Sequence, residues 1–127
     1  MRENLKCNMC DQKANELITN EYKYFYPNTI LLGQNTPICA IFLITKPEFI
    51  IGYSTDCDAV LHFSREISRH HACISWTNDS YEIKDLGSTN HTFLNGTELI
   101  PETKYKVNPG DHIAFASFTF EIIAINL

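Results

Sequence analysis

The sequence predicts an all-β fold, an antiparallel β-sandwich with a short N-terminal extension. Past residue 20, short apolar runs recur about every 8–12 residues with turn residues between them, a spacing typical of sandwiches. No 3.6-residue hydrophobic period persists there over ten residues, so no helices are expected between the strands. A chain of 127 residues is long enough for one domain with a core and too short for two.

Nine apolar runs are predicted as strands, and Glu98-Leu99 is predicted as a further strand across the Asn95-Gly96 turn. Turn-forming Gly, Pro and Asn residues separate many of them. The last run alternates apolar and polar residues from Phe118 to Ile122, as a strand with one buried face does. The predicted strands are residues 29–32, 38–44, 49–51, 59–61, 72–76, 81–84, 92–94, 98–99, 112–115 and 118–125.

Two connections have the residues of defined turns. Asn95-Gly96 tolerates positive φ at both positions, as a type I′ hairpin requires. Asn108-Pro109-Gly110-Asp111 places Pro second and Gly third, which suits a type II turn. The N-x-S/T sequences at Asn78, Asn90 and Asn95 are interpreted as turn positions and not as glycosylation sites.

The first part of the chain differs from the rest. Residues 1–21 are polar and Asn-rich and are predicted as an extension, with the sandwich domain covering residues 22–127. Cys7 and Cys10 have the spacing of half a zinc site, but a second pair is missing, so free thiols are the preferred interpretation. The aromatic residues of segment 22–26, like Trp76, are expected to pack on the domain, and the segment could also hold a partner.

Composition excludes several classes of protein. Ten Lys and Arg against fifteen Asp and Glu leave a net charge of −5, opposite to a general nucleic-acid binder. No apolar run approaches the roughly 20 residues that a membrane helix needs, and no secretory signal is expected. The five cysteines have no disulfide spacing, and Cys39 and Cys73 are expected to be buried. An intracellular location, nuclear or cytoplasmic, is therefore expected.

Two predicted loops are rich in hydrogen-bond donors. Residues 64–71 read Ser-Arg-Glu-Ile-Ser-Arg-His-His, and residues 85–90 read Asp-Leu-Gly-Ser-Thr-Asn. Loops at one end of a sandwich commonly carry its binding residues. The hydroxyls, amide, guanidinium and flexible glycine in these loops suit an anion with several acceptor oxygens, such as a phosphoryl group.

From about residue 22 to 127 the sequence resembles the forkhead-associated (FHA) domain family. Any one of the matching motifs is weak, but all of them occur in the family's order and spacing. The resemblance implies a β-sandwich that binds phosphothreonine in partner proteins through loops at one end. The motifs are Ile50-Ile51-Gly52, Asp58 before Val60-Leu61, Ile67-Ser68-Arg69-His70-His71-Ala72, Asp85-Leu86-Gly87-Ser88-Thr89-Asn90, Thr92-Phe93-Leu94-Asn95-Gly96 and Pro109-Gly110-Asp111.

The resemblance also implies roles for individual residues. Ser68 and Thr89 would contact the phosphate, with Arg69 adding donors, and Asn90 would hold the main chain of the bound peptide. His71 would brace the loop from behind. Two glycines complete the predicted set: Gly52, which would let the first loop turn toward the phosphate, and Gly87, which supports the second loop.

Two positions depart from the family pattern. The family's main phosphate-binding Arg is replaced by Tyr53, and the Gly that usually follows the asparagine is replaced by His91. Tyr53 offers one O–H donor but no charge to a group that carries about −1.5 to −2. The residues considered as substitutes for the missing charge are Lys46, Arg65, Arg69, His70 and His91.

The leading hypothesis is a non-enzymatic phosphothreonine-peptide-binding module that needs no cofactor or metal. Its partner would be a threonine-phosphorylated protein or peptide, and neither nucleic acid nor a membrane is expected as a ligand. The alternative keeps the fold but assigns a phosphate-independent interaction or dimerisation domain, so a homodimer stays open. A hydrolase built on Ser68, His71 and Asp85 is disfavoured, because no nucleophile elbow accompanies them.

Overall fold

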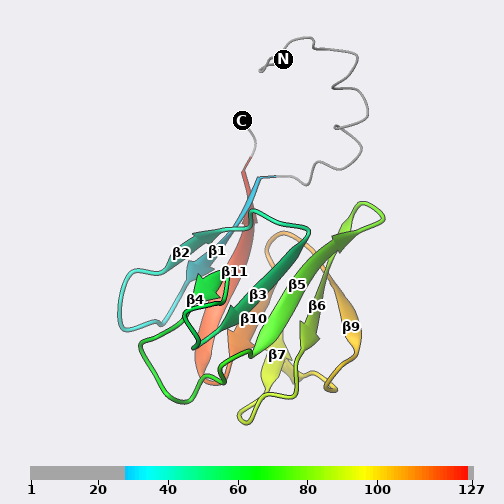
Figure 1. Cartoon of the computed structure of the whole chain (residues 1–127). Helices are drawn as coiled ribbons and strands as arrows, with labels where there is room; N and C mark the ends of the chain where they lie inside the picture. The colour runs from blue at the N-terminus through cyan, green and yellow to red at the C-terminus, as the bar shows by residue number, and fades with distance from the viewer. Residues whose placement is uncertain (1–27, 126–127) are drawn as a thin grey trace.

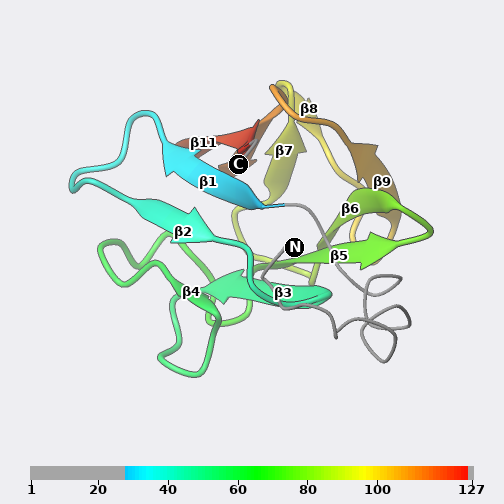
Figure 2. The same cartoon turned by 90° about the horizontal axis from the view of Figure 1, so that it is seen from above.

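The computed structural model describes residues 28–125, which form two β-sheets stacked on each other (Figures 1 and 2). The predicted β-sandwich is confirmed, and residues 28–125 contain no helix. The strands are β1 (Thr29–Gly33), β2 (Ile41–Leu43), β3 (Glu48–Gly52), β4 (Ala59–Val60), β5 (Ala72–Thr77), β6 (Ser80–Asp85), β7 (Thr92–Leu94), β8 (Thr97–Glu98), β9 (Lys104–Val107), β10 (His112–Phe115) and β11 (Phe118–Ala124).

The predictions for segment 1–21, for its boundary with the domain and for the aromatic segment 22–26 lie outside the described residues. Within the described part, no helix is long and apolar enough to cross a membrane.

One sheet has the strand order β2-β1-β11-β10-β7-β8, and the other has the order β4-β3-β5-β6-β9. Figure 2 shows β1, β2 and β11 in one layer and β3 and β5 in the other. All the strand pairs described are antiparallel except β3–β4, which is parallel. Asp58 explains this exception, since its N–H donates to the Ile50 carbonyl at 2.9 Å and its Oδ2 accepts the Ile50 N–H at 2.8 Å. Asp58 thus holds the returning chain beside β3.

Three differences from the predicted strands have local causes. Strand β9 was not predicted, although Lys104 to Val107 alternate charged and apolar residues and pair with β6 at the sheet edge. The predicted strand 38–44 shortens to β2, because Gly33 N–H donates to the Ala40 carbonyl at 2.7 Å and closes a loop. Cys39 lies in that loop and is exposed, so its predicted burial is wrong, whereas Cys73 on β5 is buried as predicted.

Both predicted turns are confirmed. Asn95 and Gly96 have φ values of 50° and 86°, the positive pair of a type I′ hairpin. Gly110 has a φ of 93°, and Asp111 N–H donates to the Asn108 carbonyl at 3.0 Å. Asn78, at a φ of 53°, also occupies a turn, as its interpretation required.

The core lies between the two sheets, and strands such as β3, β6 and β11 contribute alternate side chains to it. Phe49 and Ile51 of β3 and Phe120 and Ile122 of β11 are at most 2 % exposed. The expected packing role of Trp76 is confirmed, because its ring lies 4.7 Å from that of Tyr81 and packs against the core. Burial of apolar side chains at about 25 cal/mol per Å² supplies most of the stability of such a domain.

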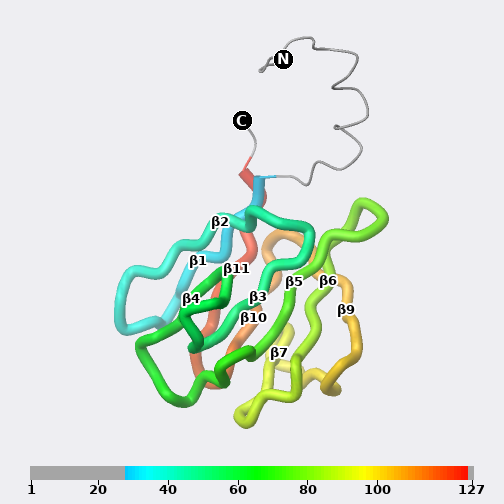
Figure 3. Tube along the Cα trace, viewed as in Figure 1, coloured from blue at the N-terminus to red at the C-terminus, as the bar shows by residue number. Residues whose placement is uncertain are grey.

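The donor-rich loops lie at one end of the sandwich, opposite the end where β1 begins and β11 finishes. At one end Thr29 of β1 pairs with Ala124 of β11. At the other end, in the lower part of Figures 1 and 3, lie the loops β3–β4 (residues 53–58), β4–β5 (61–71) and β6–β7 (86–91). The donor-rich segments of the sequence therefore meet at one end of the domain.

Candidate functional site

A hollow of about 660 Å³ lies among these three loops. It brings together five of the predicted site residues, whereas Gly52, His71 and Gly87 are not part of its lining; Gly52 and His71 are buried, and Gly87 is exposed. Its lining residues are Tyr53, Arg65, Glu66, Ile67, Ser68, Arg69, His70, Leu86, Thr89 and Asn90. Sequence reasoning missed Glu66, Ile67 and Leu86, although all three lie inside the motif segments.

Ser68 and Asn90 join the two donor-rich loops to each other. The Oγ of Ser68 accepts a hydrogen bond from Thr89 N–H at 3.0 Å. Asn90 Nδ2 donates to the Glu66 carbonyl at 2.8 Å. These bonds hold the Ser68 hydroxyl and the Thr89 backbone beside each other at the floor of the hollow, where an anion could share them.

Gly52 is needed here because two backbones approach each other closely. A Cβ added to Gly52 would lie 2.1 Å from the Arg69 carbonyl oxygen and 3.0 Å from Cys57 Sγ. Beside it, Tyr53 N–H donates to the Ser68 carbonyl at 2.9 Å and Ser54 N–H donates to the Arg69 carbonyl at 3.1 Å. Gly52 thus lets loop 53–58 lie against the segment that carries Ser68.

Tyr53 occupies the wall where the family places its arginine. Its ring stacks on His62, with ring centroids 4.3 Å apart and planes inclined by 29°. His62 Nδ1 also donates to the Tyr53 carbonyl at 3.2 Å. The position therefore presents a half-buried aromatic ring to the hollow and no positive charge.

Only some of the residues considered as substitutes for the missing arginine charge line the hollow. Arg65, Arg69 and His70 line the hollow. Lys46 does not line it, since its Nζ lies 2.7 Å from Asp58 Oδ1. His91 is also outside the lining, with its Nδ1 3.4 Å from a carboxylate oxygen of Glu98. The two arginines are therefore the strongest permanent positive charges available to a bound anion.

Asp85 anchors loop 86–91 from inside the sandwich. Its Oδ2 accepts the N–H groups of Gly87 at 2.9 Å and Ser88 at 3.0 Å, and its Oδ1 accepts the hydroxyls of Ser88 at 2.5 Å and Thr92 at 2.6 Å. Burial opposes ionisation, but the Ser88 and Thr92 hydroxyls and the two N–H groups outweigh it and hold the pKa of Asp85 below its usual value. Gly87, at a φ of 79°, lets the chain turn around this carboxylate.

His71 braces the two loops from behind the hollow. Its fully buried ring accepts the Ser68 N–H at Nδ1, 3.1 Å away, and donates from Nε2 to the His91 carbonyl at 2.9 Å. An imidazole with this pair of partners is neutral and carries its proton on Nε2. Burial lowers the pKa of His71, in keeping with this neutral form.

The side chains of Ser68, His71 and Asp85 are not hydrogen-bonded to one another as a catalytic triad. A hydrolase relay requires the histidine to join a serine hydroxyl to a carboxylate. Here His71 bonds the Ser68 backbone and the His91 carbonyl. The Ser68 hydroxyl bonds the Thr89 N–H, and the Asp85 oxygens bond Gly87, Ser88 and Thr92. These three residues therefore do not form the arrangement that the hydrolase alternative needs.

His71 predicts an acid-sensitive domain. Its folded pKa lies below the unfolded value of 6.5, so the unfolded chain binds more protons as pH falls. Its contribution to the free energy of unfolding should be complete above pH 6.5 and decrease progressively below it. Chemical denaturation at several pH values, with the His71 ring tautomer followed by NMR, tests this. A ring that titrates at or above 6.5 in the folded domain contradicts it.

His91 is held in the left-handed region, at a φ of 72°. This conformation costs a residue with a Cβ about 1–2 kcal/mol, which explains the glycine usual in the family at this position. Glycine relieves this strain but loses more backbone entropy on folding, which offsets part of the gain. We therefore expect His91→Gly to raise the free energy of unfolding by about 0.5–1 kcal/mol. Denaturant unfolding measures this, with His91→Ala as the control because it loses the Glu98 contact and keeps the strained φ. Equal stability of the two variants would contradict the prediction.

The structure therefore defines a β-sandwich domain with a candidate binding hollow formed by three loops at one end. The FHA domain model matches residues 49–116, and the chain belongs to the FHA domain family. It is 33 % identical over 78 residues to Protein FraH of Nostoc sp. (strain PCC 7120), which covers 61 % of this chain but only 27 % of FraH.

Solved structures have the same fold. The FHA domain of CT664 from Chlamydia trachomatis superposes with a TM-score of 0.69 at 27 % identity, covering 78 % of this chain and 99 % of that one. The N-terminal FHA domain of S. cerevisiae Rad53p, solved with a phosphothreonine peptide, superposes at 0.68 and 19 % identity, covering 77 % and 94 %. At that identity the second likeness concerns the fold alone.

Proposed function

We propose that this chain is a phosphothreonine-peptide-binding module that acts as a phosphorylation-dependent protein-interaction adaptor. The observation that carries the proposal is the hollow in which Ser68, Arg69, Thr89 and Asn90 come together from two loops. Membership of the FHA family supports it, as does the phosphothreonine peptide solved with a domain of the same fold.

The proposed contacts follow from the chemistry of the lining. The Ser68 hydroxyl and Thr89 donate to the phosphate oxygens, and Arg69 and Arg65 supply the positive charge. Asn90 gives up its bond to the Glu66 carbonyl, or shares it, to hold the peptide main chain. The net charge of −5 disfavours long-range attraction of a phosphopeptide, so these local donors provide the affinity.

A two-dimensional ¹⁵N NMR titration with a degenerate phosphothreonine peptide pool tests the proposal, because it detects millimolar binding. We expect shifts at Ser68, Arg69, Thr89 and Asn90 with the phosphorylated pool and none with the unphosphorylated pool. Ser68→Ala should weaken binding at least about tenfold, since a hydrogen bond to a charged group contributes about 1.5–3 kcal/mol.

Ser80→Ala is the matched control, since Ser80 begins β6 at the opposite end of the domain and its hydroxyl donates only to the nearby Thr77 carbonyl. Thermal unfolding of both variants shows whether each remains folded. Binding that survives both Ser68→Ala and removal of the phosphate would contradict the proposal.

The second candidate function is a phosphate-independent interaction or dimerisation domain. Edge strand β2 favours it, because Ile41 and Leu43 are 54 % and 49 % exposed and Ile38 before the strand is 60 % exposed. Such a patch on a strand that is an edge among the described residues can add the strand of another chain. Sedimentation of the wild type against Ile41→Lys distinguishes a dimer formed through this edge.

The proposed module is not an enzyme, needs no cofactor for peptide binding and acts inside the cell, in the nucleus or cytoplasm. Its partner is a threonine-phosphorylated protein, and neither nucleic acid nor a membrane is proposed as a ligand. Family membership supports the binding role, and the free thiols of Cys39, Cys57 and Cys73 suit a reducing compartment.

A further inference from the structure

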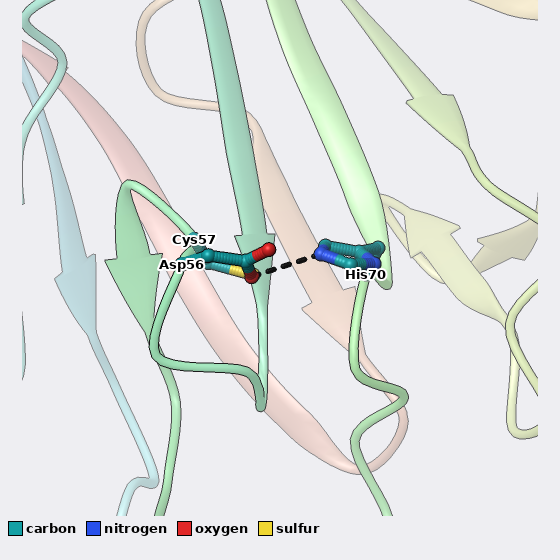
Figure 4. A group of neighbouring side chains, drawn as sticks. All are labelled: Asp56, Cys57 and His70. Atoms are coloured by element: carbon teal, nitrogen blue, oxygen red, sulfur yellow. Dashed lines mark hydrogen bonds and ion pairs between the residues drawn. The ribbon is translucent and has the colours of Figure 1, made fainter.

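Beside the hollow, three side chains of different chemistry lie together without a role in the contacts proposed above. Asp56 and Cys57 come from loop 53–58, and His70 comes from loop 61–71 (Figure 4). The carboxylate oxygens of Asp56, the Sγ of Cys57 and the ring nitrogens of His70 supply ligand atoms that all lie within 4.8 Å of one another. Carboxylate, thiolate and imidazole are the three ligand types that zinc takes from proteins.

We propose that Asp56, Cys57 and His70 form a three-ligand site for a zinc-type divalent cation beside the hollow, with His70 shared between the site and the lining of the hollow. Tetrahedral zinc with ligands at about 2.0–2.3 Å places ligand atoms roughly 3.3–3.7 Å apart. Asp56 Oδ1 and His70 Nε2 are already 2.9 Å apart. Rotation of the exposed Asp56 and His70 side chains toward the buried Sγ of Cys57 brings the ligands to bonding distance, and the fourth position is left for water or an anion oxygen.

The surrounding backbone holds the two ligand-bearing loops together. Ser54 N–H and Cys57 Sγ both donate to the Arg69 carbonyl, each at 3.1 Å, and this carbonyl directly precedes His70. The side chains of Asp56 and His70 are 68 % and 52 % exposed, so an ion can reach them. Cys57 is buried, at 8 % exposed, and a bound thiolate would form the inner side of the site.

Binding has a definite proton and charge balance. Cys57 gives up its thiol proton, as coordinating cysteines do. His70 can bind the ion only through an Nε2 that carries no proton, so the proton that Nε2 shares with Asp56 moves to Nδ1. The cluster then changes from a charge of −1 on Asp56 to zero, since +2 is added and one proton is lost. The edge of the hollow at His70 thereby becomes one unit more positive, and the bound ion keeps an open coordination position.

The gain in positive charge should couple ion binding to phosphopeptide binding, an inference that rests on the proposed function. His70 and Arg69 line the hollow, whereas Asp56 and Cys57 are outside its lining and adjoin it at His70. A loaded site should therefore tighten phosphothreonine-peptide binding, and by thermodynamic reciprocity the phosphopeptide should tighten binding of the ion by the same factor. The inference differs from the expectation, made from sequence, that no metal is bound.

Cobalt(II) is the probe for the site, because a thiolate–cobalt bond gives a near-ultraviolet charge-transfer band. The full chain is used with Cys7→Ser and Cys10→Ser, which removes the C-x₂-C pair as a competitor. We expect one equivalent of cobalt with a thiolate band that zinc displaces. Cys57→Ser should abolish the band, and His70→Ala should weaken cobalt binding at least about tenfold.

Two matched controls should leave the band unchanged: Cys73→Ser, which removes the other buried thiol, and His112→Ala, which removes an exposed imidazole elsewhere. Circular dichroism shows that each variant is folded. Absence of the band in the parent protein, or its persistence in folded Cys57→Ser, would overturn the proposal and leave only a hydrogen bond between His70 and Asp56.

A second titration separates this inference from the proposed function. Phosphothreonine peptide is added with saturating zinc and with a chelator, and a several-fold tighter complex with zinc is expected. A cobalt band without any peptide binding would refute the proposed function and keep the metal site. Equal peptide affinity with and without zinc, in a protein that shows the band, would refute the link between the ion and phosphate.

Discussion

Tyr53→Arg is expected to tighten phosphothreonine-peptide binding by about 10- to 150-fold. A hydrogen bond to a charged group contributes about 1.5–3 kcal/mol, which corresponds to that range of dissociation constants. The side chain of residue 53 lines the hollow beside Ser68 and Arg69, so a guanidinium there can reach the same oxygens. The substitution removes the stacking on His62, which costs some stability, but it keeps the backbone bond from residue 53 to Ser68 and leaves the side chains of Ser68 and Thr89 in place.

The peptide titration is repeated with Tyr53→Arg, Tyr53→Phe and the wild type at two salt concentrations. Tyr53→Phe keeps the ring and removes the hydroxyl, so its affinity reports what that donor contributes. The gain from arginine should apply to the phosphorylated peptide alone and decrease as salt increases. An equal gain for the unphosphorylated peptide would mean that residue 53 does not face the phosphate.

Gly52→Ala is expected to lower the free energy of unfolding by about 3 kcal/mol or more, a severe case of overpacking. The added Cβ would lie 2.1 Å from the Arg69 carbonyl oxygen, a backbone atom that cannot rotate away. Loops 53–58 and 61–71 would have to separate, which breaks the bonds from Tyr53 and Ser54 to residues 68 and 69. Peptide binding should be lost together with stability, because Ser68 is displaced.

Denaturant unfolding measures the effect, with Gly87→Ala as the control. Gly87 has a φ of 79° and no atom within 4 Å of an added Cβ, so this variant contains backbone strain without a steric clash. It should lose only about 1–2 kcal/mol. If the two variants were equally destabilised, close approach at Gly52 would not be the reason for its glycine.

Much of the fold could be predicted from local patterns. Alternation in Phe118 to Ile122 identified β11, and Asn95-Gly96 identified the β7–β8 hairpin, because these signals depend only on neighbouring residues. Strand β9 was missed because its lysines gave it no apolar run, although its alternation was present in the sequence. The parallel β3–β4 pair could not be predicted, since it depends on bonds from Asp58 to Ile50 eight residues away.

The sequence predicts which residues belong to the candidate site but not the contacts between them. Five predicted residues line the hollow, and motif order was enough to select them. Their bonds join Ser68 to Thr89 and Glu66 to Asn90, more than twenty residues apart in the chain, and no local pattern specifies such pairs. The sequence likewise named His91 as a departure, but only the fold gave it a left-handed φ.

The sequence by itself determined the fold class, the family resemblance and the segments that carry donors, because these follow from residue type, spacing and order. Only the tertiary structure decided which side chains share one wall. In the fold, Lys46 pairs with Asp58 and does not line the hollow, whereas Arg65 and Arg69 line it together with Tyr53. The fold also places Asp56 and Cys57 next to His70. The physical reason is that hydrophobic burial, which selects the fold, is non-directional, whereas charge and ligand chemistry depend on distances that packing alone creates.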